Sequence, residues 1–284
     1  MKIEITTLSE NMANTEFLAE WGISMLVEAD GLKVLFDTGR SFSASHNAQL
    51  LGVDLAAIDR IVISHGHLDH TGGLKEVLER SGPKEIIAHP DMWQSKYGFR
   101  KDDRMWYIGI PFVREELETL GASFVLAREP VKLSANIMTT GEVPMITDYE
   151  SIDTGLYVKE DGEEKPDIFA DDLSMIINTE FGLVVLLGCA HRGIINILRQ
   201  ALRLAGKQQI YAVIGGTHLL KASEERLAKT ASALKEMEVQ WLGVSHCTGF
   251  NAAAYLAREF GDRFFLNNAG TCLTLPFKVK EAGQ

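Results

Sequence analysis

The chain has 284 residues, 46% of them hydrophobic, and a formal net charge of −11 from 28 Lys and Arg against 39 Asp and Glu. This length suits one large domain with a substantial core, or two small ones. The acidic balance argues against a nucleic-acid partner, which usually requires a basic surface. Three dispersed cysteines, Cys189, Cys247 and Cys272, argue against a disulfide framework and favour a reducing cytoplasm.

No apolar segment typical of a signal peptide opens the chain. The longest apolar run, 182–190, is far shorter than the roughly 20 residues of a membrane-spanning helix. We therefore expect a cytoplasmic protein without a membrane span, and the sequence leaves its oligomeric state open.

The first half alternates short β-patterned segments with segments of helical spacing. An Asp30-Gly31 turn joins the second and third strands as a hairpin would. The predicted strands are 2–7, 23–28, 33–36, 60–64, 85–88, 123–126 and 136–139, and the predicted helices are 43–51, 72–80 and 115–120.

The second half repeats this order of hairpin, helix and strand. The predicted strands are 174–179, 183–187, 211–214, 241–244, 264–266 and 272–275, and the predicted helices are 194–204, 224–237 and 252–260. Two such halves favour an α/β fold in which two sheets face each other with helices outside. We therefore expect one domain over 1–284, built as a four-layer αβ/βα sandwich.

Two segments interrupt this pattern. Residues 149–172 are rich in Asp, Glu, Gly and Pro, which indicates an exposed loop or hairpin. Residues 90–111 mix aromatic with basic side chains, which suits stacking on a planar ring and neutralising a phosphate. We interpret this segment as a substrate lid carrying Trp93, Arg100 and Arg104, with a helical flap packed on the core as the alternative.

The motif Ser64-His65-Gly66-His67-Leu68-Asp69-His70-Thr71-Gly72-Gly73 lies between a predicted strand and a predicted helix. Residues two apart in extended chain point the same way, so His65 and His67 can meet one cation. Asp69 and His70 follow where the helix begins and can face a second cation. Imidazole is a suitable ligand for zinc, iron, nickel and copper, and the carboxylate means that iron and manganese also remain candidates.

Three later histidines, His191, His218 and His246, each follow a predicted strand and precede a helix. Ligands of layered α/β proteins gather at the carboxyl ends of strands. We expect His191 and His246 to join the metal site, whereas His218 is equally well a structural residue or a polar group facing the substrate. His46 and His89 are interpreted as structural.

The segment HGHLDHTGG resembles the HxHxDH signature of the metallo-β-lactamase-fold superfamily. That resemblance implies an αβ/βα sandwich with a dinuclear metal site on its edge. It implies that His65 and His67 bind one metal, that Asp69, His70 and His246 bind the other, and that Asp37 supports the metal loop from behind.

The chain departs from the family pattern at two ligands. A middle histidine is missing where Gly141-Glu142 stands, and a bridging aspartate is missing where Gly188-Cys189-Ala190-His191 stands. His191 is then a replacement ligand, and Cys189 is either a bridge or a small buried neighbour. We expect one or two divalent ions, zinc first and iron or manganese as alternatives, with Glu142 as a candidate substrate contact.

The later motifs GCAHRG, GGTHL and SHCTG resemble a narrower branch of metal-dependent hydrolases. This branch also holds an archaeal-type synthase that joins a dihydropterin diphosphate to ribofuranosylaminobenzene 5′-phosphate. The first hypothesis is a hydrolase of a small phosphorylated or ester-type substrate, with Asp69 and His218 as catalytic candidates. The alternatives are that transferase and a non-enzymatic metal-dependent sensor.

Overall fold

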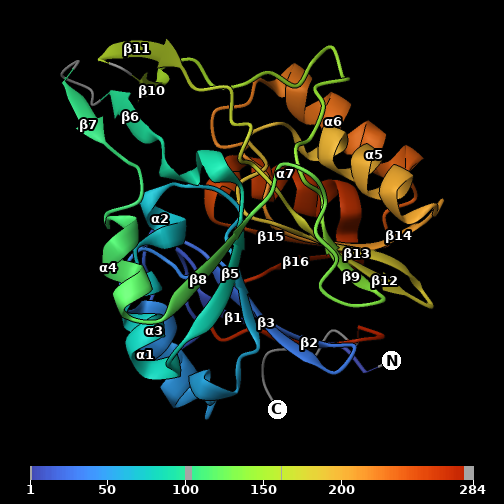
Figure 1. The fold of residues 1–284 in the computed structure, drawn as a ribbon. Coiled ribbons are helices and arrows are strands. Elements are labelled where there is room, and N and C mark those ends of the chain that lie inside the picture. Colours follow the sequence, from blue (N-terminus) through green and yellow to red (C-terminus); the bar gives the residue numbers. More distant parts are fainter. Residues whose placement is uncertain (1, 100–103, 161, 278–284) are drawn as a thin grey trace.

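A computed structural model of the protein describes residues 2–99, 104–160 and 162–277. Two large β-sheets lie face to face, and helices cover their outer faces (Figure 1). This arrangement confirms the four-layer α/β sandwich expected from the two halves of the sequence. None of the described helices is long and apolar enough to cross a membrane.

The first sheet comes mainly from the first half of the chain. The turn at Asp30 and Gly31, both with positive φ, joins its antiparallel hairpin. Its last strand arrives from the far end of the chain and pairs beside the first. In spatial order the strands are β17 (Cys272–Thr274), β1 (Glu4–Ser9), β2 (Ser24–Ala29), β3 (Leu32–Phe36), β4 (Arg60–Val62), β5 (Lys84–Ala88) and β8 (Ala122–Leu126).

The second sheet is built from the second half, apart from one edge strand. Its central strands are parallel and fully buried, as their continuous apolar sequences require. In spatial order the strands are β16 (Phe264–Leu266), β15 (Trp241–Ser245), β14 (Ile210–Gly216), β13 (Gly182–Leu187), β12 (Met175–Thr179) and β9 (Ile137–Thr139).

Three apolar clusters separate the four layers. One fills the space between the sheets, where Phe36 and Val62 of the first sheet meet Leu186 and Ile214 of the second. The other two lie under the outer helices. The helices over the first sheet are α1 (Ser43–Leu50), α3 (Leu74–Ser81) and α4 (Arg114–Thr119); those over the second are α5 (Ile194–Ala205), α6 (Glu224–Glu236) and α7 (Phe250–Phe260).

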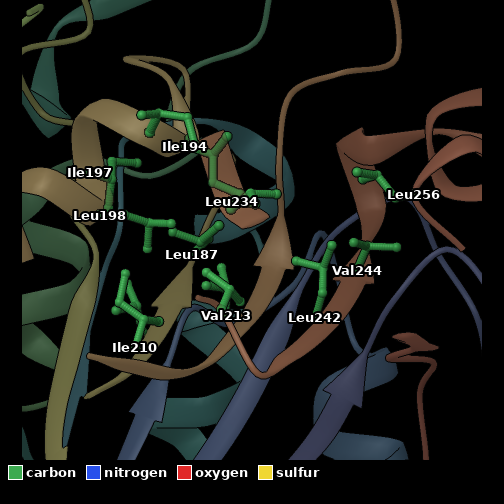
Figure 2. Packing of buried hydrophobic residues seen from close by; sticks show 14 of the residues in the cluster. Leu187, Ile194, Ile197, Leu198, Ile210, Val213, Leu234, Leu242, Val244 and Leu256 are labelled. Carbon is green, nitrogen blue, oxygen red and sulfur yellow. The ribbon is translucent and has the colours of Figure 1, made fainter. Parts of the chain in front are cut away.

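The cluster over the second sheet shows how an amphipathic helix is held there. Ile194, Ile197 and Leu198 lie on one face of α5, as their spacing of three and four residues requires. Figure 2 shows them above side chains of β13 and β14, beside Leu234 of α6. The first turn of α5 therefore has a fixed position relative to the end of β13.

A third, smaller sheet projects at one end of the sandwich (Figure 1). It consists of β11 (Glu163–Pro166), β10 (Leu156–Glu160), β6 (Ser95–Phe99) and β7 (Met105–Tyr107). The alternative of a helical flap over 90–111 is therefore wrong: apart from the one-turn 3₁₀ helix Pro90–Trp93, its described elements are strands. One of the two strand partners of β6, the strand β10, lies about 60 residues along the chain, so local patterning could not reveal this pairing.

Residues 149–172 form the hairpin β10–β11 within this sheet, as one of the two expectations had it. The end of the segment is not exposed, however. Asp167, Asp171 and Asp172 are at most 4% exposed. Asp172 accepts the Arg192 amide at 2.9 Å, and the carboxylates of Asp167 and Asp171 have the partners described below. These contacts explain why acidic residues are tolerated there.

Candidate metal centre

The histidine-rich motif follows β4 directly. His67 has extended backbone angles and is the residue before the short helix α2 (Leu68–Thr71), which carries Asp69 and His70. A Cβ at Gly66 would lie 2.2 Å from the carbonyl oxygen of Met92, so only glycine lets the chain turn there. The loop therefore presents several side chains from a very short stretch.

The second half contributes the opposite wall. His191, His218 and His246 follow β13, β14 and β15, the three neighbouring parallel strands. His218 and His246 have φ of 51° and 53°, a conformation that costs non-glycine residues about 1–3 kcal/mol. This backbone conformation directs both rings to the edge of the sandwich at which β4 of the first sheet also ends.

The two walls meet in a compact set of rings. His65 Nε2 lies 3.0 Å from His67 Nδ1, and the ring centroids of His65 and His191 are 4.9 Å apart. Among the described residues, three groups of three ligand atoms each lie within 4.8 Å of one another. The first is His65, Cys189 and His191, the second is His70, Cys189 and His246, and the third is Cys189, His218 and Cys247. Cys189 belongs to all three groups.

Asp37 lies behind the histidine loop with no exposed surface. Its Oδ1 accepts a hydrogen bond from the Ser64 amide at 2.7 Å, and its Oδ2 lies 2.7 Å from His70 Nδ1. Burial disfavours a charged His70 ring, but the Asp37 carboxylate outweighs burial and raises the pKa of His70 to about 9. With Nδ1 engaged, the Nε2 of His70 is directed to Cys189, 3.2 Å away.

Several buried ring nitrogens lack any hydrogen-bond partner. They include His67 Nε2 and both nitrogens of His191. Burial lowers the pKa of His65 and His191 strongly and that of His67 to about 3, so these rings stay neutral with a lone pair available. Unpaired buried nitrogens are costly, and neutral imidazole beside a thiol and a carboxylate is a transition-metal donor set. The residues therefore fit a metal.

Asp69 and His246 face each other across the second group. Asp69 Oδ2 lies 3.3 Å from His246 Nε2. Burial alone would raise the pKa of Asp69, yet the hydrogen bond to His246 and the neighbouring imidazoles hold it well below its usual value. The His246 amide donates to the Glu10 carboxylate, and the Trp21 ring lies 5.0 Å from the His246 ring.

His218 lies beside the first group, with its ring centroid 4.1 Å from that of His191. Its Nε2 is 3.2 Å from Asp153 Oδ2. Burial lowers the pKa of His218, but the bond to Asp153 and the contact with Cys247 outweigh burial and raise it to about 10. The contact with Asp153 therefore favours the protonated form of the His218 ring next to the histidine cluster.

A buried charged cluster supports the first group from below. Lys96 of β6 is 1% exposed, and its ammonium lies 2.7 Å from Asp167 and 3.0 Å from Asp171. Burial keeps the pKa of Asp167 above its usual value, because one ammonium serves two carboxylates. Asp171 also accepts the Gly66 amide at 2.8 Å, and Phe169 stacks on His191 at 3.9 Å.

A cavity of about 530 Å³ opens onto the histidines. Arg40, Lys221 and Asp153 contribute charge to its lining, and Trp21, Trp106 and Leu156 contribute apolar surface. Arg104 lines an adjoining cavity that shares Arg40, Leu68 and Trp106 with it. The described part of the 90–111 segment thus borders the metal edge through Arg104 and Trp106.

Two residues expected to contact substrate lie elsewhere. Trp93 packs on Phe124 at 5.1 Å, because the 3₁₀ helix that carries it turns the ring to the core under the first sheet. Glu142 pairs with His89 at 3.0 Å and with Arg128 at 2.8 Å, away from the histidine cluster. Neither residue lines the histidine cavity, and Arg100 lies outside the described residues.

Some residues at the site carried no signal in the sequence. Trp21, Arg40 and Asp153 stand in segments without a motif and reach the cavity through the fold alone. One feature of the sequence indicated that Cys189 is common to several ligand groups. It stands where the family pattern has a bridging aspartate. The supporting role of Lys96 could not be read from a segment that looked like a surface lid.

Comparisons with known proteins agree with this geometry. Residues 23–135 match the family model described as the metallo-beta-lactamase superfamily. The chain is 36% identical to the 7,8-dihydropterin-6-methyl-4-(beta-D-ribofuranosyl)-aminobenzene-5′-phosphate synthase of Methanocaldococcus jannaschii, covering 94% of this chain and 95% of the relative. An uncharacterized protein of the same organism is 32% identical, covering 89% of this chain and 94% of that protein.

A solved structure is similar over the same extent. It is described as a metal-dependent hydrolase of the beta-lactamase superfamily, with a TM-score of 0.81 and 33% sequence identity, covering 95% of this chain and 98% of that one. The family match includes the HxHxDH loop, and the relatives cover both walls of the site. The chain therefore belongs to the metallo-beta-lactamase superfamily, a superfamily of metal-dependent enzymes.

Proposed function

We propose that this enzyme is a transferase that joins a dihydropterin diphosphate to ribofuranosylaminobenzene 5′-phosphate. The observation that carries the proposal is the 36% identity to a synthase of that product along 94% of the chain. The match extends through both walls of the site rather than over the metal loop alone. A small phosphorylated substrate also suits a cavity lined by Arg40, Lys221 and His218.

The proposed reaction exchanges one bond for another. The arylamine nitrogen attacks the methylene carbon attached to the pterin ring, and a carbon–nitrogen bond forms. The carbon–oxygen bond to diphosphate breaks, and its electron pair leaves with the diphosphate oxygen. The nitrogen releases one proton, so no oxidant or reductant is needed.

The chain would hold its metal with His65, His67, His70, His191 and His246, together with Asp69 and Cys189. These donors suit one or two divalent ions, with zinc first and iron or manganese as alternatives. A bound divalent ion supplies Lewis-acid stabilisation of the negative charge on a leaving diphosphate. Asp37 orients His70 by accepting a hydrogen bond from its Nδ1, which lies 2.7 Å from Oδ2.

His218 is the residue that we assign to the leaving group. Asp153 holds its Nε2 at 3.2 Å and favours the charged ring, while Nδ1 is buried without a partner. A cationic donor beside the departing diphosphate stabilises the charge that develops on oxygen. Arg40 and Lys221, which line the same cavity, orient the diphosphate before the reaction.

Hydrolysis is the second candidate, and one observation favours it. The structure with a TM-score of 0.81 is described as a metal-dependent hydrolase. The same donors and the same charged cavity could direct water, in place of an amine, to a phosphorylated or ester-type substrate. The two candidates differ only in the nucleophile, so a product analysis separates them.

The test incubates the metal-loaded full chain with the dihydropterin diphosphate, with and without ribofuranosylaminobenzene 5′-phosphate. The proposal expects the coupled product and one equivalent of diphosphate, both dependent on the arylamine. Release of diphosphate or phosphate at the same rate without arylamine, and no coupled product, would establish hydrolysis and contradict the transferase. His218→Ala should retain its metal and lose most of the coupling rate.

A further inference from the structure

A second cavity, of about 410 Å³, lies against the metal cavity on the side of α7. The two cavities share three lining residues, Trp21, Leu220 and His246. A ring in the second cavity would therefore be separated from the metal centre only by this wall. The volume lies within the range of small-molecule sites.

The second cavity differs from the first in its chemistry. Apolar surface from β15, β16 and α7 forms most of it, including Val244, Phe250 and Phe264. Phe250 is 83% exposed, so the apolar lining reaches the surface of the molecule. Exposed aromatic surface next to a catalytic centre is a mark of ligand binding.

The polar groups at its edge are already engaged. The Glu10 carboxylate accepts the amides of Met12 and His246. The side-chain oxygen Oδ1 of Asn11 accepts the Gly22 amide at 3.2 Å, and its side-chain Nδ2 donates to the His246 backbone carbonyl at 3.2 Å. A ligand with many donors and acceptors would leave them unpaired here, at about 1–3 kcal/mol each.

We propose that this second cavity binds the benzene ring of the arylamine substrate, an assignment that rests on the proposed transferase function. A reaction of two substrates needs two subsites that meet at one wall, and these cavities meet at Trp21 and His246. The benzene ring is apolar and suits the second cavity. The pterin ring has amide-like donors and acceptors, and the diphosphate is anionic, so both belong in the charged first cavity.

The test fills the second cavity without touching the metal centre. Ala254 of α7 lines it, and Ala254→Leu adds apolar volume on a helix that tolerates leucine. Ala228, exposed on α6, lines none of the cavities described above, and Ala228→Leu is the matched control. Ala257→Leu, also lining the cavity, replaces the first variant if that protein folds poorly.

Ala254→Leu is expected to raise the KM for ribofuranosylaminobenzene 5′-phosphate about tenfold or more, because pocket volume changes of a few methylenes are felt on this scale. The KM for the dihydropterin diphosphate, the metal content and the thermal unfolding temperature should match the wild type, as should every value for Ala228→Leu. An unchanged arylamine KM, or a change in the pterin KM alone, would overturn the assignment.

Calorimetric titration with ribofuranosylaminobenzene 5′-phosphate alone separates this assignment from the transferase function. Weaker binding to Ala254→Leu than to the wild type and to Ala228→Leu supports the subsite even where no coupled product forms, an outcome that would contradict the function only. Equal binding to all three proteins, or no binding to the wild type, contradicts the subsite even where coupling is observed.

Discussion

Cys189 occupies the position at which all three ligand groups meet. Its Sγ lies within 4.8 Å of His65 and His191, and equally of His70 and His246. A thiolate there can bridge two cations. In the family pattern the missing aspartate has this bridging role. The sequence left open whether Cys189 is a ligand or a small buried neighbour, because that depends on which rings converge on it.

We predict that Cys189→Ala lowers the stoichiometry or the affinity of bound metal while the fold is retained. In cobalt-substituted protein the variant should also lose the near-ultraviolet thiolate-to-cobalt absorption band. Cys272→Ala, at an exposed cysteine in β17, is the matched control and should keep both. A Cys189→Ala protein with unchanged metal content and an unchanged band would show that the thiol is not a ligand.

A second residue, Asp37, lies behind the histidine loop and contacts both the Ser64 amide and His70. It has a φ of 59°, which asparagine also tolerates, so Asp37→Asn should keep the turn and the bond to the Ser64 amide. The variant weakens the charged contact with His70, and losses at such supporting carboxylates typically cost about 10–100-fold in metal affinity. Competition with a chelator measures this loss. Asp54→Asn, at an exposed helix cap, should bind metal like the wild type.

Among the elements, α5 shows how a remote side chain secures a strand end that carries ligands. Glu150 accepts the amides of Ile195 and Asn196, both at 2.9 Å, at the start of that helix. A Cβ at Gly193 would lie 2.4 Å from its carboxylate, so the loop after His191 closes only with glycine there. The element itself was predictable from its apolar spacing, but its cap was not, because Glu150 lies 45 residues away.

Glu150→Ala leaves two buried amides without partners and should lower the free energy of unfolding by about 1–3 kcal/mol. Glu150→Gln keeps one acceptor oxygen and should lose less. Urea unfolding monitored by circular dichroism measures both variants. Asp148→Ala, at an exposed neighbour, should stay within about 0.5 kcal/mol of the wild type, and an equal loss there would contradict the capping role.

The strand β6 is tied to the metal loop through Lys96. Lys96→Met leaves Asp167 and Asp171 buried without a cation, which should cost about 3–5 kcal/mol of stability. Burial opposes the charged lysine, but the two carboxylates outweigh it and raise the pKa of Lys96 above its ordinary 10.5. The stability that Lys96 contributes is therefore complete below pH 10.5. It is lost as the pH rises through the raised pKa of Lys96 in the folded protein.

The difference in unfolding free energy between the wild type and Lys96→Met should thus be constant from about pH 7 to pH 9, and shrink only in more alkaline solution. Lys165→Met, at an exposed lysine of β11 that pairs with Glu160, provides the control and should cost under about 1 kcal/mol. A variant as stable as the wild type would show that the buried cluster does not anchor β6.

At the scale of the whole molecule, the two halves were recognisable because each repeats hairpin, helix and strand in sequence order. Two features escaped that reasoning. The strand β17 returns from the end of the chain to pair with β1, and β6 pairs with β10 in a third sheet. Both are pairings between distant segments, and local patterning carries no information about which distant strand a given strand pairs with.

The candidate metal site lies where the two halves meet, and this placement leads to a prediction for the intact protein. His65, His67 and His70 come from the first half, whereas Cys189, His191 and His246 come from the second. An ion bound by both walls binds the folded state and not the unfolded chain, so its removal lowers stability. The sandwich has its own apolar cores and should remain folded without metal at room temperature.

Metal at roughly 100 to 1,000 times its dissociation constant stabilises a protein by about 3–4 kcal/mol. For a chain of this size that corresponds to roughly 5–15 °C in the unfolding temperature. We therefore expect chelation to lower the unfolding temperature by this amount, with the far-ultraviolet circular dichroism unchanged at 25 °C, and added zinc to restore it. The double variant His65→Ala/His246→Ala, with a ligand removed from each wall, should unfold at the same temperature with and without chelator. Metal analysis must show that the chelated wild-type protein has lost its metal. If its unfolding temperature is then unchanged, the ion does not join the two halves.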